Sequence, residues 1–553
     1  MTTDKLAKAR AFASHLTSSR SVREEKWREL SRWLAPHRAL FDGEDMAACG
    51  ERRNRNAFTQ VAQAALLRGA SGLTSGMTPR NISWFKPDFQ DAEMSEASGA
   101  RAWLDEIDRR MKEVLAAGGF YQAIHAFNTD LLWAGCALLY SERSDETVMQ
   151  FECVQTGSFG IALDGHGKLD AAVRAMNWTV ERAARTFGKS ALSQGAQSKL
   201  EKNPFDPIRV WHLARPRDYR DPGKTDAQSM PFESLFWEDS GQDFLHEGGY
   251  NEMPYFFAVW HESANPYGTG PGDDALPDAR QIDMLERRKL EGLAKLVNPP
   301  VMADFRMKEE PDLQPGGLTY LDPQIGPIRP ILDLSPYAHA FQYLQAEINA
   351  VGQRLEQELM ASIFASMPLD QRPRDMSATE FLERKREALQ QMGPVMSAYE
   401  PNVLTPLLHR LLATLDRAGL APPPPPALEG YPCFLKMDFI SPMANALRQT
   451  GAETTRALMQ DVAMLAQATQ SLEVLDKVDV DQMVDELATG LGVPGKVIRA
   501  DSDVAQIRQQ RAEAQAAQMQ QQQQMLEAQA AVQNAQGMAN AAKTVNDMEM
   551  ARQ

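Results

Sequence analysis

Residues 267–300 read YGTGPGDDALPDARQIDMLERRKLEGLAKLVNPP, and this stretch decides how the chain is organised. The glycines and the proline before Asp273 are typical of a loop that leads into a helix, and apolar residues then recur at helical spacing. Asn298-Pro299-Pro300 ends the pattern, because proline cannot continue a helix. The spacing predicts a helix over about 274–297, roughly 35 Å long at about 1.5 Å per residue.

A second long helix is predicted over residues 336–364, where large apolar side chains lie three or four positions apart. Between the two helices lies a proline-rich insert, residues 299–335, with short β-like runs. A third helix is predicted to begin at Ser377-Ala-Thr-Glu380, which has the pattern of a capping box.

The part of the chain before residue 273 mixes two kinds of pattern. Residues 1–72 have helical periodicity, and 69–87 are dense in turn formers, which predicts a loop leading into a short strand at 83–86. Residues 120–140 are almost entirely apolar and are predicted as a buried helix. Residues 150–262 contain β-like runs and an Asp164-Gly165 hairpin signal, which predicts a β-rich module. The fold class is therefore mixed α+β, mostly helical.

The C-terminal part returns to helix after a strand candidate at 433–440. Residues 443–490 are predicted to be helical. Residues 503–553 are rich in Ala, Gln and Met, which favours a helix with too few large apolar side chains to fold alone. We expect this segment either to fray or to pack against copies of itself.

Composition excludes several classes of protein. The 553 residues carry 58 Lys and Arg against 74 Asp and Glu, a net charge of −16, which argues against a broad grip on nucleic acid. An acidic chain remains suited to letting DNA slide past it. The longest apolar run is about half of what a membrane span needs. The four cysteines are scattered, so we expect neither a disulfide scaffold nor a zinc site, and we expect synthesis in the cytoplasm.

The motifs that resemble catalytic or cofactor sites are all incomplete. The stretch from Gly490 to Lys496 resembles a phosphate-binding loop, but Val497 stands where a hydroxyl must hold magnesium. His261-Glu262 begins a zinc-protease pattern whose second histidine is replaced by Asn265. The sequence therefore predicts no catalytic residue, no cofactor and no metal, and we expect a protein that is not an enzyme.

Several motifs in order resemble those of the podophage portal proteins, the head-to-tail connectors of tailed bacteriophages. The resemblance covers about residues 10–450, and the glutamine-rich tail lies outside it. It rests on these segments: Ser71-Gly-Leu-Thr-Ser-Gly-Met-Thr-Pro79 with Trp84-Phe85, Asp130-Leu-Leu-Trp-Ala-Gly-Cys-Ala-Leu-Leu139, Tyr267-Gly-Thr-Gly-Pro-Gly272 with Ala275-Leu-Pro-Asp278, Asn298-Pro-Pro300, Met376-Ser-Ala-Thr-Glu380 and Ile440-Ser-Pro-Met-Ala444.

The resemblance implies a portal-type subunit built in layers and assembled as a ring. Its parts would be a wing with the β-rich module 150–262 (1–272), a first stem helix (273–298), a clip (299–335), a second stem helix (336–364), a channel loop (365–376), a return to the wing (377–442), a crown (443–502), and a helix that extends the crown as a barrel or stays disordered (503–553). The loop would place Arg372 and Arg374 beside passing DNA.

The resemblance also implies the surroundings of the protein. It would form a dodecamer at one capsid vertex of the virion, a conduit for packaging and ejection of double-stranded DNA. Terminase and tail adaptors would dock on it, and the major capsid and scaffolding proteins would contact it, with no membrane involved.

Two other functions remain open on the residues alone. A metal-dependent hydrolase or nuclease with a dispersed site would need clustered carboxylates, for which Asp273, Asp274 and Asp278 are the best candidates. The alternative role of these acids is to stabilise the N-terminus of the helix. A self-assembling scaffold protein would instead polymerise through the glutamine-rich helix.

Overall fold

The computed structural model describes residues 2–41, 57–91, 99–298, 339–361, 393–428, 435–444 and 501–550, and positions 53, 55, 94, 301–302, 329–330, 464 and 482–483, with residues 222 and 225 excepted. The chain divides into two compact units. The first comprises Met1–Lys86, Ile107–Pro422 and Met437–Gln470, and the second Pro87–Glu106, Pro423–Lys436 and Ser471–Gln553.

Helices at the N-terminal end of the first unit pack through apolar stripes. Leu6, Ala9, Ala13 and Leu16 of α1 lie in one buried cluster with residues of the large sheet. Nearly every side chain of the second half of α6 is buried, so this helix forms the centre of the unit. The helices are α1 (Thr2–Trp33), α3 (Val61–Met77), α5 (Ala100–Ala117), which crosses between the two units, and α6 (Phe120–Ala134).

A three-stranded antiparallel sheet follows α6 directly, in the order β3-β2-β9. Its central strand β2 has six successive buried residues, because both of its faces are covered. The strands are β2 (Cys136–Ser144), β3 (Val148–Val154) and β9 (Tyr255–Val259).

The larger sheet has five antiparallel strands in sequential order, β4-β5-β6-β7-β8. Val173, Leu213, Leu235 and Trp237 face α1, and Ile208, Val210 and Phe236 face two short helices on the other side. Its elements are β4 (Phe159–Leu163), β5 (Leu169–Thr179), α7 (Val180–Phe187), η1 (Lys189–Ala191), α8 (Gln194–Lys202), β6 (Pro207–Pro216), β7 (Phe232–Glu238) and β8 (Phe244–Tyr250).

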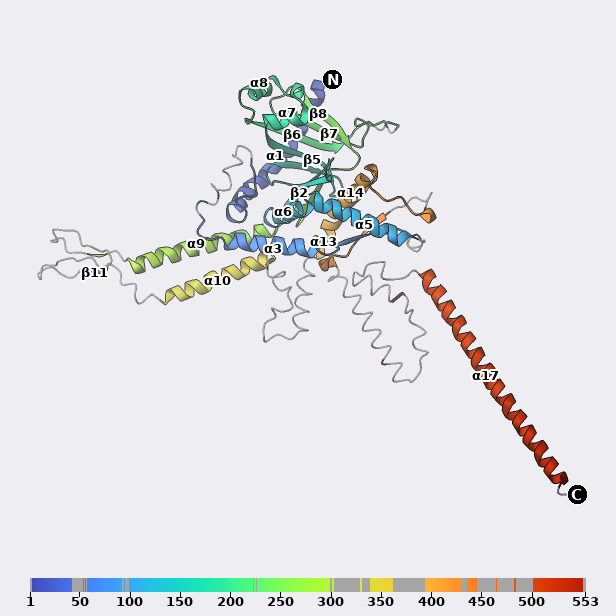
Figure 1. Ribbon diagram of the computed structural model, residues 1–553. Coiled ribbons are helices and arrows are strands. Elements are labelled where there is room, and N and C mark those ends of the chain that lie inside the picture. Colours follow the sequence, from blue (N-terminus) through green and yellow to red (C-terminus); the bar gives the residue numbers. More distant parts are fainter. Residues whose placement is uncertain are drawn as a thin grey trace. The chain divides into compact units, whose positions relative to one another are not determined.

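Two long helices, α9 (Pro271–Val297) and α10 (Ala340–Glu358), lie side by side (Figure 1). The short strands β10 (Val301–Met302) and β11 (Arg329–Pro330) pair antiparallel between them in sequence. The first unit also contains α13 (Gly393–Tyr399), the π-helical segment η4 (Glu400–Leu404) and α14 (Thr405–Arg417).

The described parts of the second unit are few. They include the 3₁₀ turn η5 (Pro426–Leu428) and the long helix α17 (Asp501–Met550), whose described side chains are almost all exposed. The strands β1 (Phe85–Phe89) and β12 (Leu435–Phe439) form a two-stranded sheet, and each strand contains residues assigned to both units. The predicted strand at 433–440 and the helical character of the glutamine-rich segment are confirmed.

Two expectations about the first unit are wrong. The first part of the segment predicted as a loop, residues 69–77, is the second half of α3, because Gly69 serves close packing and not a turn. A Cβ on Gly69 would lie 2.1 Å from the carbonyl oxygen of Leu359, so only glycine allows α3 this approach. The predicted helix 120–140 ends at Ala134, and the chain continues as β2.

Two boundaries also differ. The strands begin at Cys136 and not near residue 150, and the module they form contains the helices α7 and α8, which the sequence did not predict. The second long helix ends at Glu358 instead of residue 364, and Met360 has a left-handed backbone conformation with φ of 60°. The other predicted helices, at 377–393 and for most of 443–490, lie outside the described residues.

Among the described residues, no helix combines the length and the apolar character that crossing a bilayer requires.

Candidate functional site: the α9–α10 helix pair

The start of α9 is fixed by its own first turn and by α1. Gly270 caps the helix, and its backbone N–H donates to the Asp273 carboxylate at 3.0 Å. Arg23 on α1 forms two hydrogen bonds to the same carboxylate, one of them 2.9 Å from Nη1 to Oδ1. Both side chains are largely buried, so this ion pair is screened little by solvent. The predicted loop that leads into a helix is confirmed.

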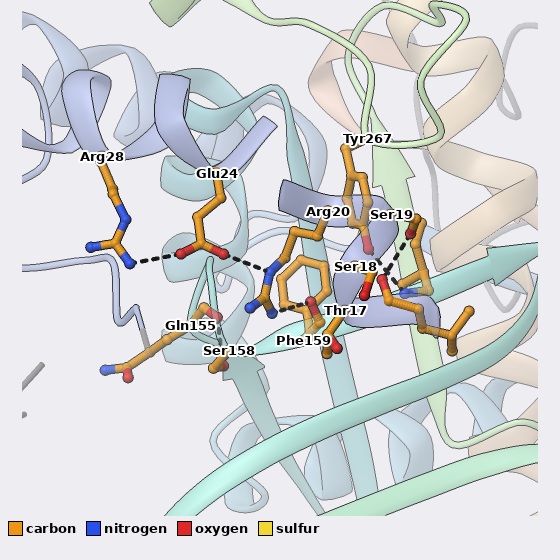
Figure 2. Close-up of polar contacts among 12 residues, drawn as sticks. Thr17, Ser18, Ser19, Arg20, Glu24, Arg28, Gln155, Ser158, Phe159 and Tyr267 are labelled. Carbon is orange, nitrogen blue, oxygen red and sulfur yellow. Dashed lines mark hydrogen bonds and ion pairs between the residues drawn. The ribbon is translucent and has the colours of Figure 1, made fainter. Parts of the chain in front are cut away.

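Helix α1 also holds the segment that precedes α9 (Figure 2). Arg20 donates to the carbonyl oxygen of Phe159 at 2.8 Å and to Glu24 at 3.2 Å, and Arg28 donates to the other oxygen of Glu24 at 2.7 Å. The Tyr267 hydroxyl accepts the N–H of Ile161 at 3.2 Å. These bonds connect α1 to β4 and β4 to the segment just before α9. The start of the helix pair is therefore fixed to the sheet and to α1.

The two long helices run antiparallel. Arg354 near the end of α10 donates to Asp278 near the start of α9 at 2.7 Å, whereas Lys289 contacts Gln345 farther along the pair. Ile282 of α9 and Ile348, Val351 and Leu355 of α10 are buried apolar side chains of the pair. The buried Asp283 carboxylate accepts two backbone N–H groups, those of Phe58 and Thr59, at 2.6 Å and 3.2 Å.

The far half of the pair exposes large apolar side chains. Packing among the described residues leaves each of these side chains with more than a third of its surface exposed. These residues are Met284, Leu290, Leu293 and Val297 of α9 and Tyr343 of α10. Leu290, Leu293 and Val297 lie three and four positions apart, so they share one face of α9, and an exposed apolar face of this kind indicates a contact with another molecule.

The end of α10 carries an acidic group with an unusual pKa. Burial, followed by repulsion from Asp278 and Asp274, raises the pKa of Glu358 to about 7, while Arg354 acts in the opposite direction. The buried Oε2 atom has no hydrogen-bond partner among the described residues. Above neutral pH, ionised Glu358 therefore destabilises the folded protein.

We expect Glu358→Gln to change the pH dependence of stability. Because its pKa is raised, Glu358 holds a proton more tightly in the folded state than in the unfolded state between about pH 4.5 and 7. Protonated Glu358 therefore favours the folded state at low pH, and this contribution to the free energy of unfolding is lost as the pH rises through 7. The variant should melt a few degrees higher than the wild type at about pH 8 and equally at about pH 4.5. Glu356→Gln is the control, because Glu356 pairs with Arg68 at 2.8 Å and its loss should not stabilise. Scanning calorimetry at both pH values measures this, and equal melting at pH 8 contradicts it.

The acidic residues weighed as a metal site have structural roles. Asp273 caps α9 and pairs with Arg23, and Asp278 pairs with Arg354. Within the described part of the chain, no three His, Cys, Asp or Glu side chains gather in a way that could hold a metal ion.

The channel candidates Arg372 and Arg374 lie outside the described residues, as do most of the insert 299–335 and the glycine-rich stretch 490–496. His261 belongs to an isolated bridge with Thr269 and not to a helix. Sequence reasoning missed the Arg23–Asp273 anchor, because the two residues are 250 positions apart and no local pattern joins them.

Sequence comparison relates the chain to known phage proteins. A family model described as bacteriophage head to tail connecting protein matches residues 6–498. The probable portal protein of Bordetella phage BPP-1 is 30% identical over 501 residues, 88% of this chain and 88% of that protein. The portal protein of Salmonella phage epsilon15 is 29% identical over 547 residues, 97% of this chain and 94% of that protein.

Among solved structures, a chain from the neck of an empty GTA particle is 12% identical and covers 76% of this chain and 91% of its own, with a TM-score of 0.33. At that score the likeness carries no argument. The family match and the two relatives span nearly the whole chain, and they agree with each other. The chain therefore belongs to the family of bacteriophage head-to-tail connecting proteins, the structural, non-enzymatic portal proteins of the virion vertex through which phage DNA is packaged.

Proposed function

We propose that this portal protein assembles as a closed ring of twelve subunits around double-stranded DNA, with the α9–α10 pair as its stem. The observation that carries the proposal is the row of exposed apolar side chains Leu290, Leu293 and Val297 along one face of α9. In a closed ring each subunit contacts its neighbour in the same way, so the same face is covered in every copy. Side chains that are exposed in a single subunit would be buried there. Residues 1–272 would form the wing and residues 377–442 its return.

The remaining parts follow from the same proposal. The insert 299–335 would be the clip on which terminase docks during packaging and tail adaptors dock later, and residues 443–502 would form the crown. Helix α17 would extend the crown. The major capsid and scaffolding proteins would contact the outside of the ring.

Ring formation is tested by particle mass. Twelve chains of 61.5 kDa give 738 kDa, and mass photometry with negative-stain imaging should show rings of that mass. Val297→Glu should shift most of the mass to smaller species, since it places a charge where apolar surface is expected to be covered. Val22→Glu on α1 is the control: the two valines are similarly exposed, 79% and 84%, and this variant should form rings.

Deleting residues 503–553 distinguishes the ring from a scaffold that polymerises through α17. The ring should persist without that helix, because the stem and wing contacts remain. Collapse of the truncated protein to monomers, or open filaments from the full chain, would contradict the proposal.

We also propose that Arg372 and Arg374 line the channel in the loop 365–376. Isolated cations in an acidic channel bind phosphate weakly and release it easily, which suits a moving duplex. The double variant Arg372→Ala with Arg374→Ala should assemble normally and change the number of genome-filled particles by about two-fold or more. Counting filled and empty particles after infection measures this. Unchanged packaging and infectivity would remove these residues from the channel.

A further inference from the structure

A cavity of about 830 Å³ lies in the first unit, apart from the helix pair. Its volume is within the range of pockets that hold ligands. Both sheets and the helix α7 line it. The lining residues that matter for binding are Tyr140, Glu142, Arg143, Glu152, Arg174 and Arg182.

The floor of this cavity is a buried cation. Arg174 on β5 is only 5% exposed, and its guanidinium lies 4.0 Å from the centre of the Tyr140 ring. Nη1 donates to Glu152 at 2.8 Å, whereas the buried Nε finds no acceptor among the described residues. His212 lies beside Arg174 in the sheet, and burial together with the Arg174 charge lowers the pKa of His212, so it stays neutral. The floor therefore keeps a positive charge with an unmet capacity to donate.

The rim adds two cations. Arg182 on α7 lies with its guanidinium 4.4 Å from the Trp178 ring, and Arg143 extends from the end of β2. Within the described residues neither forms an ion pair, in contrast to Arg38 and Arg174, which pair with Asp130 and Glu152. Glu142 is the remaining carboxylate of the lining, and burial raises its pKa. The cavity is thus locally basic on a chain whose net charge is −16.

We propose that this cavity binds an acidic segment of another protein chain, a loop or tail whose carboxylates contact Arg182 and Arg143. Carboxylates are the natural partners of guanidinium groups, which can bind them with two parallel hydrogen bonds. The aromatic walls suit the apolar parts of a peptide. Glu142 and Glu152 would repel the evenly spaced phosphates of a nucleic acid, whereas a peptide can place neutral residues opposite them.

The test is a titration of the full-length protein into a fluorescently labelled peptide of about ten residues that alternates Glu and Ala. Fluorescence anisotropy of the peptide measures the binding. A Lys-Ala peptide of equal length and a short DNA duplex are the comparison probes. Arg182→Glu should weaken binding of the acidic peptide by about tenfold or more. Arg185→Glu is the matched control, because Arg185 lies on the same helix, outside the lining, and pairs with Glu181. It should change the affinity by less than about two-fold.

Two further variants keep the result interpretable. Arg143→Glu changes an exposed residue, tolerates folding, and should also weaken binding. Glu142→Gln removes a carboxylate from the lining and should tighten binding several-fold. The proposal is overturned if the acidic peptide does not bind, if the duplex binds equally well, if Arg182→Glu and Arg185→Glu weaken binding alike, or if Glu142→Gln weakens it.

Discussion

Gly135→Ala is expected to destabilise the first unit by roughly 3–5 kcal/mol, because two independent costs add at this position. Gly135 ends α6 with a φ of 82°, which non-glycine residues rarely adopt. A Cβ there would lie 2.6 Å from the carbonyl carbon of Thr269, which belongs to the segment before α9. Backbone atoms cannot move aside as a side chain can, so α6, β2 and the base of α9 would have to shift together.

Two other glycines allow the cost of the backbone strain to be measured separately from the cost of the close contact. Gly119 has a φ of 75° and open space around its Cβ position, so Gly119→Ala should cost only the strain, about 1 kcal/mol. Gly165 has neither the strain nor a close neighbour, and Gly165→Ala should be neutral. Urea titrations of the three variants should give the order Gly135, Gly119, Gly165. Equal midpoints for the first two would contradict the close contact.

Asp130→Ala is the second change with a large expected effect, roughly 3–5 kcal/mol, since it breaks a buried ion pair from one side. Asp130 on α6 is fully buried, and Arg38 donates to its two oxygens at 2.9 Å and 2.7 Å. The indole N–H of Trp133 donates to the same carboxylate at 2.9 Å. The variant leaves both donors without this acceptor, and calorimetry or urea titration of the full chain measures the loss.

The same variant has a chemical readout that simple loss of packing would not produce. Burial, and next the Asp130 charge, hold the pKa of the Cys153 thiol well above its usual range, while Arg38 lowers it. Without Asp130 the Arg38 charge acts alone, so the pH at which Cys153 begins to react with a thiol reagent should fall, whereas loss of packing alone would raise the rate without moving that pH. Asp4→Ala is the control: it removes an exposed pair with Lys8, and it should change stability by less than about 0.5 kcal/mol.

The sequence predicted those elements whose signals are local. The helix α9 has its glycines and proline at the start, an apolar stripe and a terminating Pro-Pro pair, all within one continuous stretch. The hairpin between β4 and β5 was equally visible, because Asp164-Gly165 lies between two alternating runs. In both cases the residues that specify the element are neighbours in the chain.

The errors came from residues whose meaning depends on distant partners. The glycines of α3 look like turn formers until Leu359, almost three hundred positions away, is seen against Gly69. Residues 131–140 are apolar throughout, so periodicity could not separate the end of a buried helix from a buried strand. The charged lining of the cavity was likewise hidden, since β2, β3, β5 and α7 contribute to it separately.

The short pairing of β10 with β11 has a consequence for how portals of this type diverge. Val301 lies opposite Pro330 and Met302 opposite Arg329, so the segment between the two strands begins and ends at one place. Such a cassette, a length of chain closed by two paired strands, can be replaced as a unit. Doubling the length of a closed loop costs only about 0.6 kcal/mol, so such a cassette can be lengthened or swapped without altering the register of α9 and α10. Grafting the corresponding segment of a relative between β10 and β11 is therefore a practical test of whether this insert is the clip proposed above.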